Sequence, residues 1–237
     1  MNQSDRKKRS GAQDDIVYAH IFDAILEQRL APATRLSEEA LGEIFGVSRT
    51  VIRRALSRLA HEGVVSLRPN RGAVVACPNA AEAVEILHAR RLVELAIIRL
   101  AALRATHEDL AGLRALVAAE RDCLARGDRG ASIRLSGEFH LRLAEAAGNA
   151  PLLGFQRSLV SQTSLIIARY ERGPGDHCAC EEHDALLDAL AARNTEQAVA
   201  LMAHHLDHID ARLQLDAERS STDLRSVFSQ VVQARSG

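Results

Sequence analysis

Residues 36–59 read LSEEALGEIFGVSRTVIRRALSRL, and this stretch decides the fold. Ser37 and the two glutamates after it have the polar, acidic character of a helix N-terminus, and the helix that they begin ends before Gly46. Ser48 caps a second helix, whose inward positions recur every three or four residues. Apolar residues occupy those positions at Ile52, Ala55, Leu56 and Leu59. The stretch therefore predicts two helices joined by a tight turn.

A further helix and a hairpin flank this stretch. Before it, an apolar face runs from Val17 to Ile25, and the helix ends near Pro32, because proline disfavours helix in the residue before it. After it come two β-prone runs, 64–67 and 73–76, separated by a basic turn. The order helix, short helix, turn, helix and hairpin is that of a winged helix-turn-helix, whose third helix enters the major groove of DNA.

The outward face of the third helix carries basic and hydroxyl side chains. Arg49 and Arg53 lie one turn apart, so they point outward together. Each can contact a phosphate or take the O6 and N7 atoms of guanine in a bidentate fork. Ser48 and Thr50 can reach a phosphate with hydroxyl or backbone N–H groups. A single arginine is usually a solvated surface charge, but this pair coincides with the turn and the wing, which favours DNA binding.

The stretch resembles the DNA-binding domain of the GntR family, and the similarity continues through residues 62–65 and 71–75. The resemblance places the family's DNA contacts on Ser48, Arg49, Thr50, Arg53 and Gly72. Arg71 lies beside Gly72 at the tip of the wing, where both would follow the DNA backbone closely. Glu39 stands where many family members have an arginine in the second helix, so we expect that contact to differ in this chain.

Composition and charge agree with a mainly α protein of two domains. Its 237 residues exceed one typical domain, and the 3% of aromatic residues, without tryptophan, favour helices packed through Leu, Ile, Val and Ala. Residues 1–78 hold 12 Lys and Arg against 9 Asp and Glu, and the remainder is acidic. The four cysteines occur without a secretory leader or an apolar stretch that could span a membrane. We therefore expect a cytoplasmic protein with reduced thiols and no membrane partner.

Four segments are expected along the chain. Residues 1–12 are predicted to form a disordered basic arm and residues 13–78 the winged helix-turn-helix domain. Across 79–217 the strand signals almost vanish and apolar residues recur with a helical period. Residues 218–237 form a polar tail with a weak apolar stripe, which either docks on a partner subunit or frays. The second domain is predicted to be an antiparallel six-helix bundle, with helices at about 80–104, 107–126, 129–147, 151–172, 178–193 and 195–217.

Three helices of this second domain each bring a histidine, namely His140, His183 and His205. A single histidine is usually a surface residue or a satisfied core residue, but neutral imidazoles that converge inside a bundle form a good transition-metal site. The segments around them resemble the FCD ligand-binding domain of the FadR subfamily over about 82–215, and six helices fit its VanR-like branch. In metal-containing members, three histidines and an aspartate bind a divalent ion, and the resemblance matches those histidines to the three here.

Ser136 stands where those members have the aspartate, four residues before His140. Its hydroxyl is a weaker ligand than a carboxylate, but three histidines with open positions still suit zinc or nickel. Cys180 lies three residues before His183, so it shares that helical face and is either a replacement fourth ligand or a small buried residue.

Open metal positions inside a bundle cavity suit a small carboxylate, with an arginine supplying a charge-assisted pair. Arg90 is the first candidate for that arginine, although an ion pair with Glu94 on the helix surface explains it almost as well, and Arg169 is the second candidate.

These features predict a homodimer that reads an inverted repeat in double-stranded DNA, because matched half-sites require recognition helices related by a two-fold axis. We expect a repressor that a small organic acid releases from its operator. Two alternatives stay open, a metal-dependent hydrolase that uses zinc-bound water and a regulator whose helical domain only dimerises. The sequence has no H-E-x-x-H motif, which argues against the hydrolase.

Overall fold

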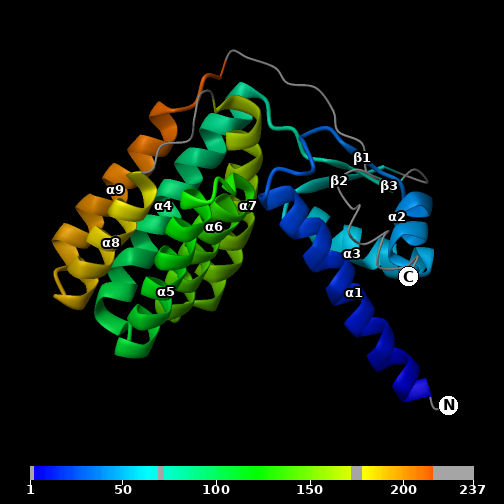
Figure 1. Cartoon of the computed structure of the whole chain (residues 1–237), viewed down its shortest axis with the longest axis horizontal. Coiled ribbons are helices and arrows are strands. Elements are labelled where there is room, and N and C mark those ends of the chain that lie inside the picture. The colour runs from blue at the N-terminus through cyan, green and yellow to red at the C-terminus, as the bar shows by residue number, and fades with distance from the viewer. Residues whose placement is uncertain (1–2, 69–71, 172–177, 216–237) are drawn as a thin grey trace. The chain divides into compact units, whose positions relative to one another are not determined.

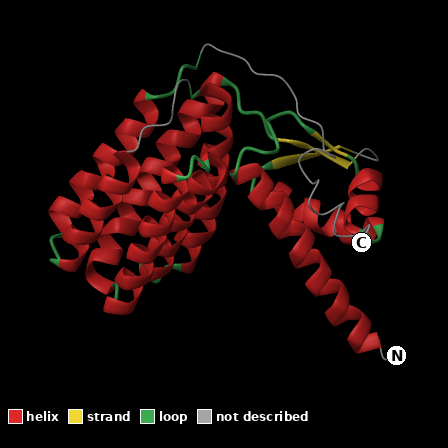
Figure 2. Cartoon of the chain, viewed as in Figure 1, coloured by secondary structure: helices red, strands yellow, loops and turns green. Residues whose placement is uncertain are grey.

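The structure is a computed structural model of the chain, and it describes residues 3–68, 72–171 and 178–215. These residues fall into two compact units, the first ending at Cys77 and the second beginning at Pro78 (Figure 1). Figure 2 shows strands in the first unit, whereas the described part of the second is helical. No helix among the described residues combines the length and the hydrophobicity that a membrane span needs.

The first unit combines helices with a small antiparallel sheet, as the winged helix-turn-helix prediction requires. Its described elements are α1 (Gln3–Leu26), β1 (Arg35–Leu36), α2 (Glu38–Phe45), α3 (Arg49–His61), β2 (Val65–Arg68) and β3 (Gly72–Val75). The three strands lie in the order β1-β3-β2. Ser37 and Ser48 are the N-caps of α2 and α3, and Gly46 ends α2 with a φ of 67°. The predicted helices, turn and hairpin are therefore confirmed.

Helix α1 differs from its prediction, because it begins at Gln3 and so includes residues assigned to a disordered arm. Residues 3–12 lack an apolar face, which is why periodicity did not reveal them. Most of them are polar residues that tolerate a helix, so the backbone hydrogen bonds of the amphipathic segment after Gln13 continue toward the N-terminus.

Strand β1 is an element that the sequence analysis missed. Arg35 pairs with Val74 and Leu36 with Ala73, so β1 adds a third strand beside the hairpin. The close approach of Gly72 permits this pairing. Its φ is +83°, and a Cβ atom built there would lie 2.2 Å from the carbonyl oxygen of Leu36. Position 72 therefore needs glycine for its backbone.

We expect Gly72→Ala to lower the free energy of unfolding of the first unit by about 1–3 kcal/mol, since an L side chain is strained at this φ and would collide with β1. Native-state hydrogen exchange of the sheet amides would measure the loss. Gly112→Ala is the control, because Gly112 lies in a helix with open space around its Cα. An equal protection of the sheet in both variants would contradict this role of Gly72.

The second unit consists, within its described residues, of the six predicted helices (Figure 1). They are α4 (Ala80–Arg104), α5 (His107–Ala125), α6 (Arg129–Ala146), α7 (Ala150–Tyr170), α8 (Cys178–Ala191) and α9 (Thr195–Ala211). Helix α4 packs against both α7 and α9, and α5 packs against α6 and α8. The core is formed mainly by Leu, Ile, Val and Ala, and it includes the fully buried Phe139. Charged and imidazole side chains interrupt this apolar core between the helices.

Candidate metal centre and nucleic-acid interface

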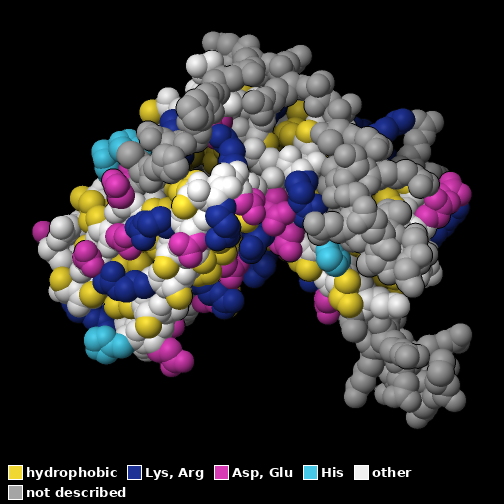
Figure 3. Space-filling model, viewed as in Figure 1, with side chains coloured by type: hydrophobic (Ala, Val, Ile, Leu, Met, Phe, Trp, Pro, Cys, Tyr) yellow, Lys and Arg dark blue, Asp and Glu magenta, His cyan; other side chains and the backbone are white. Residues whose placement is uncertain are grey.

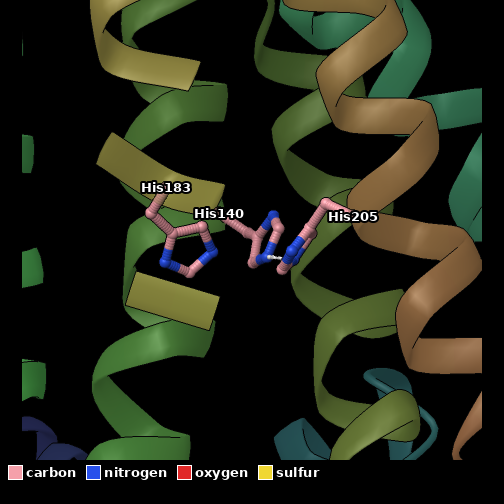
Figure 4. A group of neighbouring side chains, drawn as sticks. All are labelled: His140, His183 and His205. Atoms are coloured by element: carbon pink, nitrogen blue, oxygen red, sulfur yellow. Dashed lines mark hydrogen bonds between the residues drawn. The ribbon is translucent and has the colours of Figure 1, made fainter. Parts of the chain in front are cut away.

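The three predicted histidines converge inside the helical unit. His140 comes from α6, His183 from α8 and His205 from α9, and their rings point toward one another (Figure 4). All three are buried, with no more than 2% of any residue exposed. One ring nitrogen of each lies within 4.8 Å of the other two, and the Nε2 atoms of His140 and His205 are 3.2 Å apart. This group can hold a metal ion.

A carboxylate faces the Nδ1 atom of each ring. Glu94 lies 2.7 Å from His140, Glu120 lies 3.3 Å from His183, and Glu182 lies 2.6 Å from His205. An ionised carboxylate only accepts hydrogen bonds, so each Nδ1 carries the proton and donates it. The Nε2 lone pairs are then directed at the centre of the group. Carboxylates behind histidines are the usual second layer of a metal site, and they fix the ring orientation and raise its basicity.

The Nε2 atoms have no satisfactory partner within the described protein. Nε2 of His183 is buried without a hydrogen bond, which costs about 1–3 kcal/mol. Nε2 of His140 and Nε2 of His205 are both acceptors when their Nδ1 atoms donate, so their lone pairs repel each other at 3.2 Å. A cation placed among the three atoms would satisfy all of them, so the donor set fits a divalent metal.

Burial keeps His140 and His205 neutral, as metal ligation requires. It lowers the pKa of His140 and lowers the pKa of His205 to about 3, although the carboxylates favour protonation. Burial also opposes the ionised form of Glu94, but His140 and Arg90 outweigh it and hold the pKa of Glu94 far below its usual range. The group therefore combines two neutral imidazoles, of His140 and His205, with the anionic carboxylate of Glu94.

The lowered pKa of His205 predicts that the metal-free protein loses stability in mild acid. The unfolded chain protonates His205 near pH 6.5, whereas the folded protein does so only near pH 3. Between these values the unfolded state binds more protons, so stability falls as the pH falls. At pH 5 this one group lowers the free energy of unfolding by about 2 kcal/mol relative to pH 7.

Urea unfolding of chelator-treated protein at pH 7 and pH 5 would measure this loss. His205→Gln is the matched comparison, because it lacks the titrating ring, and we expect its pH dependence to be smaller by about 2 kcal/mol. The same pH dependence in both proteins would contradict the burial of a neutral His205.

A cavity of about 350 Å³ opens beside two of the histidines. Its lining includes His140, His205, Ser136 and the arginines Arg90, Arg129 and Arg212. Arg90 lines the cavity, and its Nε donates to Glu94 at 2.7 Å, but this ion pair is buried and does not lie on the helix surface as predicted. Ser136 is partly buried and lines the same cavity as His140 and His205.

Two candidates from the sequence lie elsewhere. Arg169 does not line this cavity: its guanidinium donates to the carbonyl oxygen of Pro78 at 3.0 Å and lies over the ring of Tyr170. Arg169 is near the C-terminal end of α7, and this position places its side chain beside Pro78, the first residue of the second unit. Cys180 is outside the histidine group and belongs to the apolar core, where burial raises the pKa of its thiol to about 11. The interpretation of Cys180 as a small buried residue fits this position.

Arg129 and Arg212 were not singled out in the sequence, because an arginine at the end of a helix is usually a solvated surface charge. Both form ion pairs with the buried carboxylate of Glu171, and Arg212 does so at 3.4 Å. Glu171 also lines the cavity. An anionic ligand in the cavity could therefore replace Glu171 as the partner of these two arginines.

The predicted DNA-contacting residues of α3 are exposed, as their position on the helix requires. Ser48, Arg49, Thr50 and Arg53 all belong to this exposed face. Both arginines pair with acidic residues of α2, Arg49 with Glu39 at 3.2 Å and Arg53 with Glu38 at 2.8 Å. Such exposed pairs contribute at most about 1 kcal/mol each, so a phosphate can replace them. Arg71 lies outside the described residues, and Gly72 is buried against β1.

Comparison with known proteins gives matches in both units. The family model described as "Bacterial regulatory proteins, gntR family" matches residues 13–75, and the FCD domain model matches residues 85–208. The Uxu operon transcriptional regulator of Escherichia coli is 31% identical over 219 residues, which span 83% of this chain and 85% of that protein. The HTH-type transcriptional repressor NanR of Cronobacter sakazakii is 28% identical over 209 residues, 78% of this chain and 79% of its own length.

Solved structures show the same fold. The structure of E. coli McbR/YncC superposes with a TM-score of 0.75 at 24% identity, covering 84% of this chain and 95% of that one. The crystal structure of a putative transcriptional regulator GntR from Rhodococcus sp. RHA1 gives a TM-score of 0.71 at 25% identity, covering 84% of this chain and 96% of that one.

Proposed function

Because this chain belongs to the GntR family of bacterial regulatory proteins and carries an FCD domain, we propose that it is a metal-containing repressor that a small organic acid releases from its operator. The family consists of transcription regulators and not of enzymes, which removes the hydrolase alternative. Several relatives are named as transcriptional regulators or repressors, and NanR of Cronobacter sakazakii is one of the repressors.

The observation that carries the sensor proposal is the set of three buried imidazoles, one ring nitrogen of each lying within 4.8 Å of the other two, beside a cavity. His140, His183 and His205 would hold the ion, and three imidazoles suit zinc or nickel. When bound, the ion supplies positive charge and open coordination positions for a carboxylate. A helical domain that only dimerises would have no need of three buried imidazoles, so this group favours a sensor over a purely structural domain.

The cavity suits a small organic acid. Its arginines supply positive charge at the wall. The hydroxyls of Thr163 and Ser164 donate to carbonyl oxygens of α7 and can accept hydrogen bonds from a ligand, and the hydroxyl of Ser136 also lines the cavity. One carboxylate of the acid would lie at the ion held by the three histidines, and a second polar group of the acid would lie near Arg129 and Arg212. The internal pairs with Glu171 keep these arginines oriented before the ligand arrives.

DNA binding is assigned to the first unit of a homodimer. Two copies of α3 related by a two-fold axis would enter adjacent major grooves of an inverted repeat, with Arg49 and Arg53 at bases or phosphates. The acid lowers operator affinity only if it binds the DNA-free state more tightly than the DNA-bound state.

A ligand screen followed by DNA titration tests this coupling. Fluorescence anisotropy with an operator selected from random DNA would measure affinity with and without acids that raise the thermal midpoint of the metal-loaded protein. We expect an active acid to weaken binding at least about 10-fold, within the usual range of allosteric coupling, and Arg129→Ala to lose this response. Arg114→Ala is the control, because Arg114 is an exposed arginine paired with Asp188 outside the cavity. An acid that binds in the cavity without changing operator affinity would contradict the release mechanism.

A further inference from the structure

A second group of metal-ligating side chains lies at the surface of the helical unit. It consists of Glu182 of α8 with His204 and His208 of α9, and one ligand atom of each lies within 4.8 Å of the others. Figure 3 shows histidine side chains at the surface of this unit. His204 is exposed and the side chain of His208 is 44% exposed, whereas the Glu182 side chain is only 16% exposed. The group therefore combines an anchored carboxylate with two accessible imidazoles.

The fold brings these three side chains close together. His204 and His208 lie one helical turn apart, and their ring centroids are separated by 4.1 Å. Glu182 reaches them from the neighbouring helix and accepts a hydrogen bond from Nδ1 of His208.

We propose that Glu182, His204 and His208 form an outer site for a divalent transition metal, distinct from the group of His140, His183 and His205. Two imidazoles and one carboxylate suit zinc, nickel, cobalt or ferrous iron. Because the histidines are exposed, water completes the coordination and the ion exchanges with solvent. The outer site binds more weakly than a buried site, since mobile surface side chains lose rotamer freedom on binding. This proposal is independent of metal at the inner group.

Glu182 connects the two groups. One of its oxygens accepts a hydrogen bond from Nδ1 of His205 at 2.6 Å, and the other accepts from Nδ1 of His208. An outer cation draws negative charge from the carboxylate that orients His205, and such carboxylates affect metal affinity by about 10–100-fold. Filling the outer site therefore weakens the inner site. The carboxylate of Asp207, between the two histidines in sequence, is already paired with Arg91 at 2.7 Å.

Equilibrium dialysis of the full-length protein against Ni²⁺ tests the proposal, with bound nickel measured by mass spectrometry. We expect two equivalents in the wild type and one in the double variant His204→Ala/His208→Ala. His88→Ala/His107→Ala is the matched control, because it also removes two exposed histidines, and it should still bind two equivalents. Equal stoichiometry in the wild type and the His204→Ala/His208→Ala variant would overturn the outer site.

Two more variants separate the outer site from the inner one. His183→Ala should lose the tight equivalent and keep the weak one, so a failure of the inner group alone would leave the outer result intact. Glu182→Gln should lose the weak equivalent and bind the remaining one about 10–100-fold less tightly. An unchanged tight affinity in Glu182→Gln would overturn the proposed sharing of this carboxylate.

Discussion

Replacing His183 with alanine is expected to leave the purified protein without its tightly bound metal ion. Only two imidazoles would remain, and removal of a direct ligand should exceed the 10–100-fold loss that is typical of second-layer changes. The wild type should gain about 3 kcal/mol of stability at a free metal concentration near 100 times its dissociation constant, and the variant should gain almost none. Elemental analysis and thermal unfolding with added zinc or nickel would measure both effects.

His88→Ala is the control for this experiment, because it removes an exposed histidine from α4. Glu120→Gln provides an intermediate case, since Glu120 lies behind His183 at 3.3 Å and a neutral amide would orient the ring less strongly. We expect metal affinity to decrease in the order wild type, Glu120→Gln, His183→Ala. If the wild type bound no metal, and its thermal midpoint ignored added zinc and nickel, the inner site would be wrong.

Replacing either Arg49 or Arg53 with alanine should weaken operator binding by about 1–3 kcal/mol. Titrations on specific and random DNA separate the two kinds of contact. An arginine that reads a base should affect only the specific sequence, whereas an arginine that contacts a phosphate should weaken both and reduce the salt dependence by about one charge. Fluorescence anisotropy at several salt concentrations would give both quantities.

Arg114→Ala is again a suitable control, because Arg114 forms the same kind of exposed ion pair in the other unit. Glu39→Ala gives the opposite sign, since Arg49 would no longer exchange a carboxylate 3.2 Å away for DNA, and we expect slightly tighter binding. Unchanged footprints for both arginine variants would exclude α3 as the recognition helix.

The local features of the fold could be predicted from sequence because each depends on neighbouring residues. Ser48 caps α3 through its own next turn, and Gly46 ends α2 with a positive φ. The breaks at Gly127 and Gly148 were likewise visible as turn chemistry. Strand β1 was missed because two residues carry no period, and its pairing with β3 depends on a glycine far along the chain.

The candidate site likewise contains residues that the sequence revealed and residues that only the structure revealed. The histidines were recognisable from their motif, but the carboxylates behind them were not, because Glu94 and Glu120 are 46 and 63 residues away from His140 and His183 in sequence. Arg169 was chosen for its charge and its helix, and only the packing shows that it binds the carbonyl oxygen of Pro78. Long-range contacts therefore decided which charged residues face the cavity.

The close approach of Gly72 to Leu36 has a consequence for engineering and for evolution. The wing and the start of the helix-turn-helix share one sheet, so neither can be exchanged alone. A chimaera that takes its wing from a relative must also take a compatible residue pair at positions 36 and 72, or the donor wing will not pair with β1. Among related sequences, a bulky residue at position 72 should occur only where the backbone at residues 35–36 also differs. This correlation between position 72 and residues 35–36 could be sought across the family.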